Sequence, residues 1–194
     1  MVPSARLSAG MAVAGALALA GPSLGACAIA LASTGTTPGK STPPSSKKPN
    51  ARERALLHSH ELWATIDVCN PANQRNTIGL RGSMPGDGQP HDIMYMSFRL
   101  QYMNASRQWV DLSKSASSGF VAVGGGGSAR QGGTSFELKP VAGHPVATLR
   151  GVVDFQWRHG RKIVLSTAEP TSAGHESLAG ADPAGFSAAT CAIG

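Results

Sequence analysis

The sequence has few charged residues, few aromatic residues and no signature of a known catalytic or metal site. Charged residues make up 14% of the 194 residues and aromatic residues 5%, whereas average chains are about 25% charged. There is no CxxC pair, no HExxH motif and no P-loop, which excludes the zinc and nucleotide sites that those motifs mark. The segment closest to a nucleophile elbow is Gly82–Gly86. Its serine directly follows the first glycine, whereas the Gly-x-Ser-x-Gly motif requires the serine at the central position. We therefore expect a protein that is not an enzyme.

The positive charge lies near the N-terminus and not in the part that can fold. Of the net charge of +6, residues 61–194 carry only +1, from eight Arg and three Lys against ten acids. Residues 33–60 carry +4 and Arg6 the remaining +1. Nucleic-acid binding needs a basic face on the folded domain, so nucleic acid is excluded as a partner.

Residues 1–32 have the pattern of a signal peptide or a membrane anchor, because a single base, Arg6, precedes a long apolar run. Three outcomes stay open. Cleavage after Ala18–Ala20 or Ala30–Ala32 releases the chain, since both have small residues at the required spacing. Leu24–Cys27 resembles a bacterial lipobox, in which Cys27 is lipidated. A retained anchor is also long enough, since about 20 apolar residues span a membrane. Each outcome places the rest of the chain in the cell envelope or outside the cell, with membrane contact only through this segment.

Residues 33–59 form a predicted linker that is rich in Ser, Thr, Pro and Lys. Residues 33–50 contain no aromatic residue and no aliphatic residue larger than proline, so they bury too little apolar surface to offset the entropy of ordering. Residues 51–58 suffice for one or two helical turns, which is too short for a stable isolated helix. The linker is either a stalk that lifts a domain from the envelope or a remnant of the leader.

Residues 60–194 alternate between apolar and polar side chains, which predicts half-buried strands. In the longest run the apolar face consists of Met94, Met96, Phe98, Leu100 and Tyr102. Turns at Asn104–Ser106 and His159–Gly160 separate such runs, and the last strand is expected over Gly185–Ile193. The pattern gives eight or nine short antiparallel strands, and we therefore expect an all-β fold, a β-sandwich of two packed sheets.

The cysteines favour one disulfide bond. If the leader is cleaved or Cys27 is lipidated, Cys69 and Cys191 remain as an even pair. They lie at the end of the first predicted strand and in the last one. An oxidising compartment favours a bond between them, and free thiols are the alternative in a reduced chain.

The run Leu149–Trp157 with its following His-Gly turn, together with the C-terminal segment 181–193, resembles secreted bacterial immunoglobulin-like or fibronectin-type domains. The resemblance covers about residues 60–194. It implies an immunoglobulin-like sandwich architecture and no ligand. The antibody arrangement of a tryptophan shortly after the first cysteine is absent, because Trp109 follows Cys69 by 40 residues.

Two groups of residues are candidates for a site. His91 with Met94 and Met96 offers imidazole and thioether ligands that suit Cu(I), although methionines that continue an apolar face also fit a core. The second group lies in two predicted loops, residues 84–92 with Asp87 and Asp92 and residues 124–133 with Gly125 and Arg130. Loops at the end of a sandwich commonly carry binding residues, so these loops predict a contact surface. No EF-hand spacing supports calcium there.

We therefore expect a non-enzymatic exported protein without a cofactor, in which a β-sandwich serves surface interaction or structural display. Its expected partner is a protein or a glycan. The alternatives are an exported copper-binding protein that uses His91, Met94 and Met96, and a hydrolase whose active site is assembled from loops.

Overall fold

The structure is a computed structural model that describes residues 48–113, 116–140, 143, 145–175 and 179–194. The predicted leader, its cleavage sites, Cys27 and residues 33–47 of the predicted linker lie outside the described residues. Within the described part the chain forms one helix and nine strands: α1 (Ala51–Leu57), β1 (Trp63–Cys69), β2 (Thr77–Met84), β3 (Gln89–Met103), β4 (Trp109–Asp111), β5 (Ser117–Gly126), β6 (Arg130–Glu137), β7 (Ala147–His159), β8 (Lys162–Pro170) and β9 (Cys191–Ile193).

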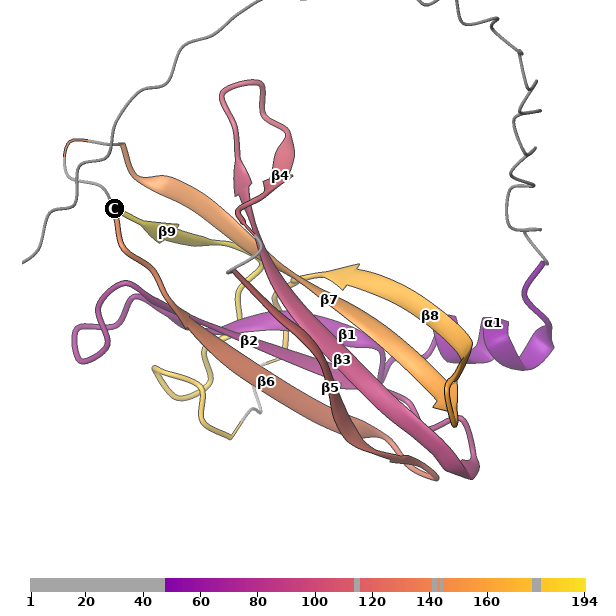
Figure 1. The fold of residues 1–194 in the computed structure, drawn as a ribbon. Helices are drawn as coiled ribbons and strands as arrows, with labels where there is room; N and C mark the ends of the chain where they lie inside the picture. Colours follow the sequence, from indigo (N-terminus) through magenta and orange to yellow (C-terminus); the bar gives the residue numbers. More distant parts are fainter. Residues whose placement is uncertain (1–47, 114–115, 141–142, 144, 176–178) are drawn as a thin grey trace, which may run out of the picture. The chain divides into compact units, whose positions relative to one another are not determined.

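The strands form two antiparallel sheets that pack face to face, so the predicted β-sandwich is confirmed (Figure 1). The small sheet has three strands in the order β1-β2-β6, and the large sheet has six. In the large sheet β3 and β7 lie side by side at the centre, with β4 and β5 along the free side of β3 and β8 and β9 along that of β7.

The core is formed by the inward face of each sheet, as the alternation predicted. Along β3 the buried apolar residues are every second one from Met94 to Leu100, and along β7 they include Phe155 and Trp157. The small sheet contributes Ile66, Ile78 and Leu80. The described polar side-chain atoms that are buried all have a hydrogen-bond partner, as native interiors require.

Gly151 in β7 lies in close contact with Leu80 of the small sheet. A Cβ atom at this position would lie 2.5 Å from Cδ2 of Leu80 and 2.8 Å from Cγ2 of Thr171. The missing side chain therefore leaves room for Leu80 of the opposite sheet.

β1 is buried on both faces, whereas the alternation predicted one exposed face. Thr65 is fully buried and its hydroxyl donates to the carbonyl of Ser172 at 2.7 Å, and Asp67 is also buried. The covering comes from the C-terminal segment, which makes isolated bridges from Asp182 and Ala188 to β1.

The last strand is shorter than predicted, since only Cys191–Ile193 of the expected range Gly185–Ile193 pairs as a strand. Gly185 has φ of 79°, and the N–H of Phe186 donates to the carbonyl of Pro183 at 2.9 Å. The chain therefore makes a turn here, and strand pairing begins only at Cys191.

Residues 51–57, the end of the predicted linker, form the helix α1. Asn50 caps it: its side chain accepts a hydrogen bond from the N–H of Glu53, and the Glu53 carboxylate accepts one from the N–H of Asn50. This capping box satisfies two N–H groups at the start of the helix. Arg52 donates to the carbonyl of Asp87, which attaches the helix to the sandwich.

Cys69 and Cys191 form a disulfide bond, as predicted, with their Cα atoms 5.6 Å apart. The bond joins the end of β1 in the small sheet to the start of β9 in the large sheet. A disulfide indicates an oxidising location outside the cytoplasm.

Candidate functional site

The candidate site is the outer face of the large sheet, which points away from the core. On β3 and β7 the residues that alternate with the core pair across the strands as Ile93 with Arg158, Tyr95 with Gln156 and Gln101 with Arg150. We define the outer face by the outward residues of four neighbouring strands: Ile93, Tyr95, Arg99, Gln101, Trp109, Asp111, Phe120, Arg150, Asp154, Gln156 and Arg158.

Arg150 is held by an amide and an aromatic ring. Its Nε donates to Oε1 of Gln101 at 2.8 Å, and its guanidinium carbon lies 4.5 Å from the centre of the Trp109 ring. Burial and the neighbouring charge of Arg99 lower the pKa of Arg150, although arginine stays protonated in proteins. Its charge is thus stabilised by stacking, and no carboxylate of the described residues pairs with it.

Arg158, eight residues further along β7, has the same type of environment. Its Nε donates to Oε1 of Gln156 at 2.8 Å. Its guanidinium carbon lies 4.1 Å from the centre of the Tyr95 ring and 5.1 Å from that of Phe120. Phe120 is 42% exposed, so this cluster faces solvent.

Arg99, between these two clusters, is neutralised by carboxylates. Its Nε lies 3.1 Å from Oδ2 of Asp154 and its Nη1 lies 2.6 Å from Oδ1 of Asp111. Burial disfavours the charged guanidinium, but the hydrogen bonds and charges of the two aspartates outweigh it and raise the pKa of Arg99. The hydrogen bond from Gln101, together with Arg99, lowers the pKa of Asp111.

The predicted loop residues gather at another place, the end of the sandwich where the chain between β2 and β3 meets the connection from β5 to β6. Both loops are shorter than predicted, since residues 89–92 belong to β3, residues 124–126 to β5 and residues 130–133 to β6. The N–H of Gly88 donates to the carbonyl of Gly126 at 2.9 Å. A Cβ atom on Gly125 would lie 3.2 Å from the carbonyl oxygen of Pro90, and one on Gly124 would lie 2.8 Å from Nε of Arg130. The glycines carry the chain from the large sheet to the small one and permit this close approach.

Asp87 and Asp92 are buried together at this end, with 8% and 4% of their surface exposed. Oδ1 of Asp87 accepts from the N–H of Gln89 at 2.9 Å, and Oδ1 of Asp92 lies 2.7 Å from Nδ1 of His159. Burial, together with the hydrogen bond and charge of Asp92, raises the pKa of Asp87 although the Gln89 N–H opposes this. The hydrogen bond with His159 lowers the pKa of Asp92 despite its burial.

We expect Asp87→Asn to raise stability at neutral pH. In the folded state the pKa of Asp87 lies above its ordinary value of 3.8, so the folded protein binds this proton more tightly than the unfolded chain and loses stability as the pH rises through the raised pKa. Asparagine stays neutral and keeps an oxygen for the Gln89 N–H. Urea unfolding at pH 4 to 7 should show a higher midpoint for the variant at pH 7 and a smaller difference near pH 4.

Asp92→Asn is the matched control, and it should change the stability at pH 7 in the opposite direction. The pKa of Asp92 is lowered from 3.8, so its charged form stabilises the fold at neutral pH and that contribution is lost only as the pH falls through the lowered pKa. The control should therefore be less stable than the wild type at pH 7. An Asp87→Asn protein equally destabilised at pH 4 and pH 7 would contradict the assignment.

The three residues considered for copper do not come together. Met94 and Met96 are fully buried between the sheets, whereas His91 is exposed. The side chain of His91 points to the opposite face of β3, because it lies an odd number of residues from both methionines. Within the described ranges, no group of three or more His, Cys, Asp or Glu side chains is placed to hold a metal ion.

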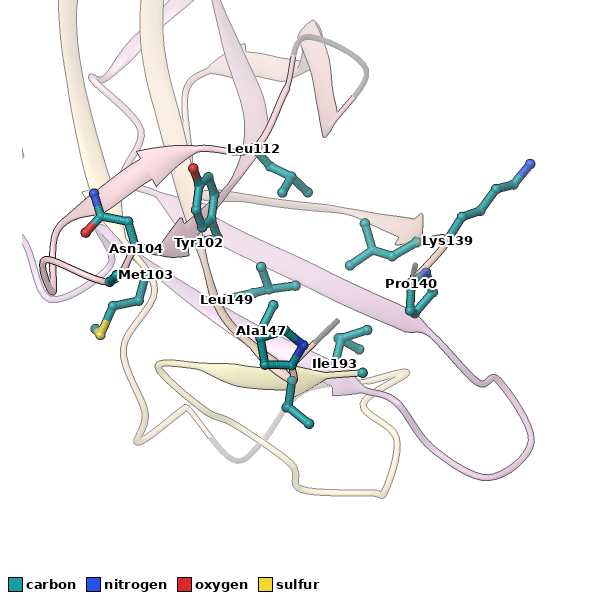
Figure 2. Close-up of a pocket in the computed structure, with 14 residues that line it drawn as sticks. Tyr102, Met103, Asn104, Leu112, Lys139, Pro140, Ala147, Leu149 and Ile193 are labelled. Carbon is teal, nitrogen blue, oxygen red and sulfur yellow. The ribbon is translucent and has the colours of Figure 1, made fainter. Parts of the chain in front are cut away.

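A groove of about 760 Å³ lies at the opposite end of the sandwich, near β9 (Figure 2). Its walls are mostly apolar and include Tyr102, Leu149 and Ile193. Figure 2 shows the Lys139 side chain extending away from these apolar groups. Ligand pockets combine apolar walls with a few converging polar groups. Because the charged group of Lys139 points away, the groove is not our candidate site.

The predicted site residues do not include the outer face, although the sequence carried a signal for it. Arg150 and Arg158 are separated by an even number of residues within one predicted strand, so they had to lie on the same face. Their aromatic and amide partners come from β3, β4, β5 and β7, and pairing between distant strands is not visible in the sequence.

No helix in the described part of the chain is long and apolar enough to cross a membrane.

Comparison with known proteins assigns no family. No protein-family model matches the chain, and no curated protein matches its sequence. Among solved structures, the chain is similar to Pseudomonas fluorescens alkylpurine DNA glycosylase AlkC bound to DNA containing an abasic site analog, at 12% identity and a TM-score of 0.26 over 57% of this chain. The match spans only 29% of that chain. So low a TM-score identifies neither a shared fold nor a function.

Proposed function

We propose that the protein is an exported, non-enzymatic interaction module of the cell envelope, and that it binds a protein or glycan partner through the outer face of the large sheet. The observation that carries this proposal is the pair of arginines, Arg150 and Arg158, each fixed on an exposed face by an aromatic ring and an amide.

The composition and rigidity of the outer face support the proposal. Tyrosine, tryptophan and arginine supply most of the binding energy at interfaces, and Tyr95, Trp109 and the two arginines lie on this face. Binding normally costs about 0.5–1.5 kcal/mol for each flexible side chain that becomes ordered. Because the stacked arginines are already held in the free protein, much of that cost is avoided.

The disulfide bond supports export, because such bonds persist outside the cytoplasm. The leader pattern of residues 1–32 and the resemblance to secreted immunoglobulin-like domains agree with it. We therefore include an immunoglobulin-like kinship in the proposal. The copper-binding and hydrolase alternatives are not taken further.

The proposal is tested by blocking the outer face without removing any of its contacts. Ser166 and Ala168 are exposed on β8 and pair with Gln156 and Asp154. Changing both to tyrosine adds bulk beside the outer face. We expect the purified exported protein to co-sediment with isolated envelopes of its own organism, and the double variant to bind at least tenfold more weakly.

Ser135→Tyr is the matched control, because Ser135 is exposed on β6 of the small sheet. It should bind envelopes like the wild type. Equal weakening by Ser135→Tyr, or full binding by the double variant, would place the contact surface elsewhere. Protein found only in the cytosol would refute export.

A further inference from the structure

The two arginines of β7 share one arrangement. In both, Nε donates to a glutamine side chain at 2.8 Å, namely Gln101 for Arg150 and Gln156 for Arg158. In both, the guanidinium also stacks on an aromatic ring. The same construction therefore occurs twice on one face.

Neither arginine has a carboxylate partner among the described residues, where the ion pairs of the outer face belong to Arg99. A guanidinium carries five N–H donors in a planar fork that matches a carboxylate. The bond to glutamine uses Nε and leaves the two terminal nitrogens of each arginine for a ligand. Each arginine with its glutamine and its aromatic ring, here called a receptor, therefore presents terminal guanidinium N–H groups whose geometry suits a carboxylate.

The receptors lie at a fixed separation on one strand. Eight residues of extended chain place Arg150 and Arg158 about 26 Å apart. Between them Arg99 is neutralised by Asp111 and Asp154. Beyond β7, the exposed Arg161 and Lys162 extend the positive charge past its end. A ligand that uses both receptors must carry negative charges that recur along its length.

We propose that the outer face binds an acidic polysaccharide, whose repeated uronate carboxylates pair with Arg150 and Arg158. This inference rests on the proposed function and names the partner. A linear polymer with a carboxylate on each sugar meets both receptors in many registers. An acidic segment of a folded protein has to present its carboxylates at one fixed spacing. Charge complementarity therefore favours the polymer.

The test uses polygalacturonate as the probe, titrated calorimetrically into the purified exported protein, with neutral dextran as the uncharged comparison. We expect measurable binding of polygalacturonate and none of dextran. Arg150→Gln and Arg158→Gln should each weaken binding by about tenfold, and the double variant by about a hundredfold, since each substitution removes one charge-assisted contact worth about 1.4 kcal/mol. A galacturonate trimer, too short to span both receptors, should bind more weakly than the polymer.

Arg75→Gln is the matched control, because Arg75 is exposed between β1 and β2, away from the outer face, and its loss changes the net charge equally. It should bind polygalacturonate like the wild type. Equal weakening by Arg75→Gln would show attraction by net charge only and overturn the inference. Tighter binding of poly-glutamate than of polygalacturonate would also overturn it, in favour of an acidic protein.

The experiments distinguish failure of the polysaccharide inference from failure of the proposed interaction function. If the tyrosine variant of Ser166 and Ala168 loses envelope binding while polygalacturonate does not bind, the outer face is a contact surface for another partner and only this inference fails. If envelope binding survives the tyrosine variant, the proposed function fails, whatever the polymer does. Folding of each variant is verified by its circular-dichroism spectrum and unfolding midpoint.

Discussion

Replacing Cys69 and Cys191 together by alanine is expected to lower the free energy of unfolding by about 4–5 kcal/mol, since a cross-link over a long loop removes this much chain entropy from the unfolded state. The bridged residues are 122 positions apart, so nearly the whole sandwich lies within the closed loop. Domains are stable by about 5–15 kcal/mol in total. The loss therefore brings the protein close to its limit of stability, which urea unfolding at 25 °C measures.

Reduction of the wild type by dithiothreitol is the control, because it opens the loop without changing a side chain in the core. Both proteins should unfold at similarly lowered urea concentrations, and their m-values should rise as the unfolded chain expands. A double alanine variant as stable as the oxidised wild type would show that the bond contributes nothing to stability.

The second large effect is expected for Trp157→Ala, at about 3–5 kcal/mol of lost stability. The Trp157 side chain is fully buried between the sheets, so truncation leaves a large cavity. Its indole N–H also donates to the carbonyl of Pro85 at 3.0 Å, which fixes the start of the connection from β2 to β3. Removing the donor leaves a buried carbonyl unpaired, and chemical unfolding monitored by circular dichroism reports the sum.

Trp157→Phe separates the two contributions. Phenylalanine fills most of the volume but cannot donate a hydrogen bond, so the residual loss is expected near 1–3 kcal/mol, the cost of an unpaired buried carbonyl. If both variants lose equal stability, the hydrogen bond to Pro85 and not the packing dominates at this site.

The strand pattern was predictable because alternation depends on nearest neighbours along the chain. The apolar residues from Met94 to Leu100, and Phe155 with Trp157, are buried as the period of two required. The turn at His159–Gly160 is also found, with φ of 56° at Gly160. Such features are local, so a single sequence carries them.

The burial of polar residues and the composition of the outer face were not predictable, because they depend on contacts between segments that are distant in the sequence. Thr65 lies on the polar side of its strand, yet Ser172 and the C-terminal segment cover it. The outer face was missed for the same reason, since Trp109 and Arg150 meet only because β3 places β4 and β7 on its two sides. Asp87 and Asp92 were picked out as loop residues, but their burial against each other required the fold.

The disulfide also determines how the domain bears mechanical load. A ligand pulling on β7 transmits force through its backbone pairing with β9 at Thr148 and Ala192, and from there through Cys191 to Cys69 and β1. Tension that reaches Cys191 passes through the covalent bond directly to Cys69 and bypasses the 122-residue loop, about 400 Å of extended chain. The bond therefore limits how far the domain can lengthen when its two ends are pulled apart.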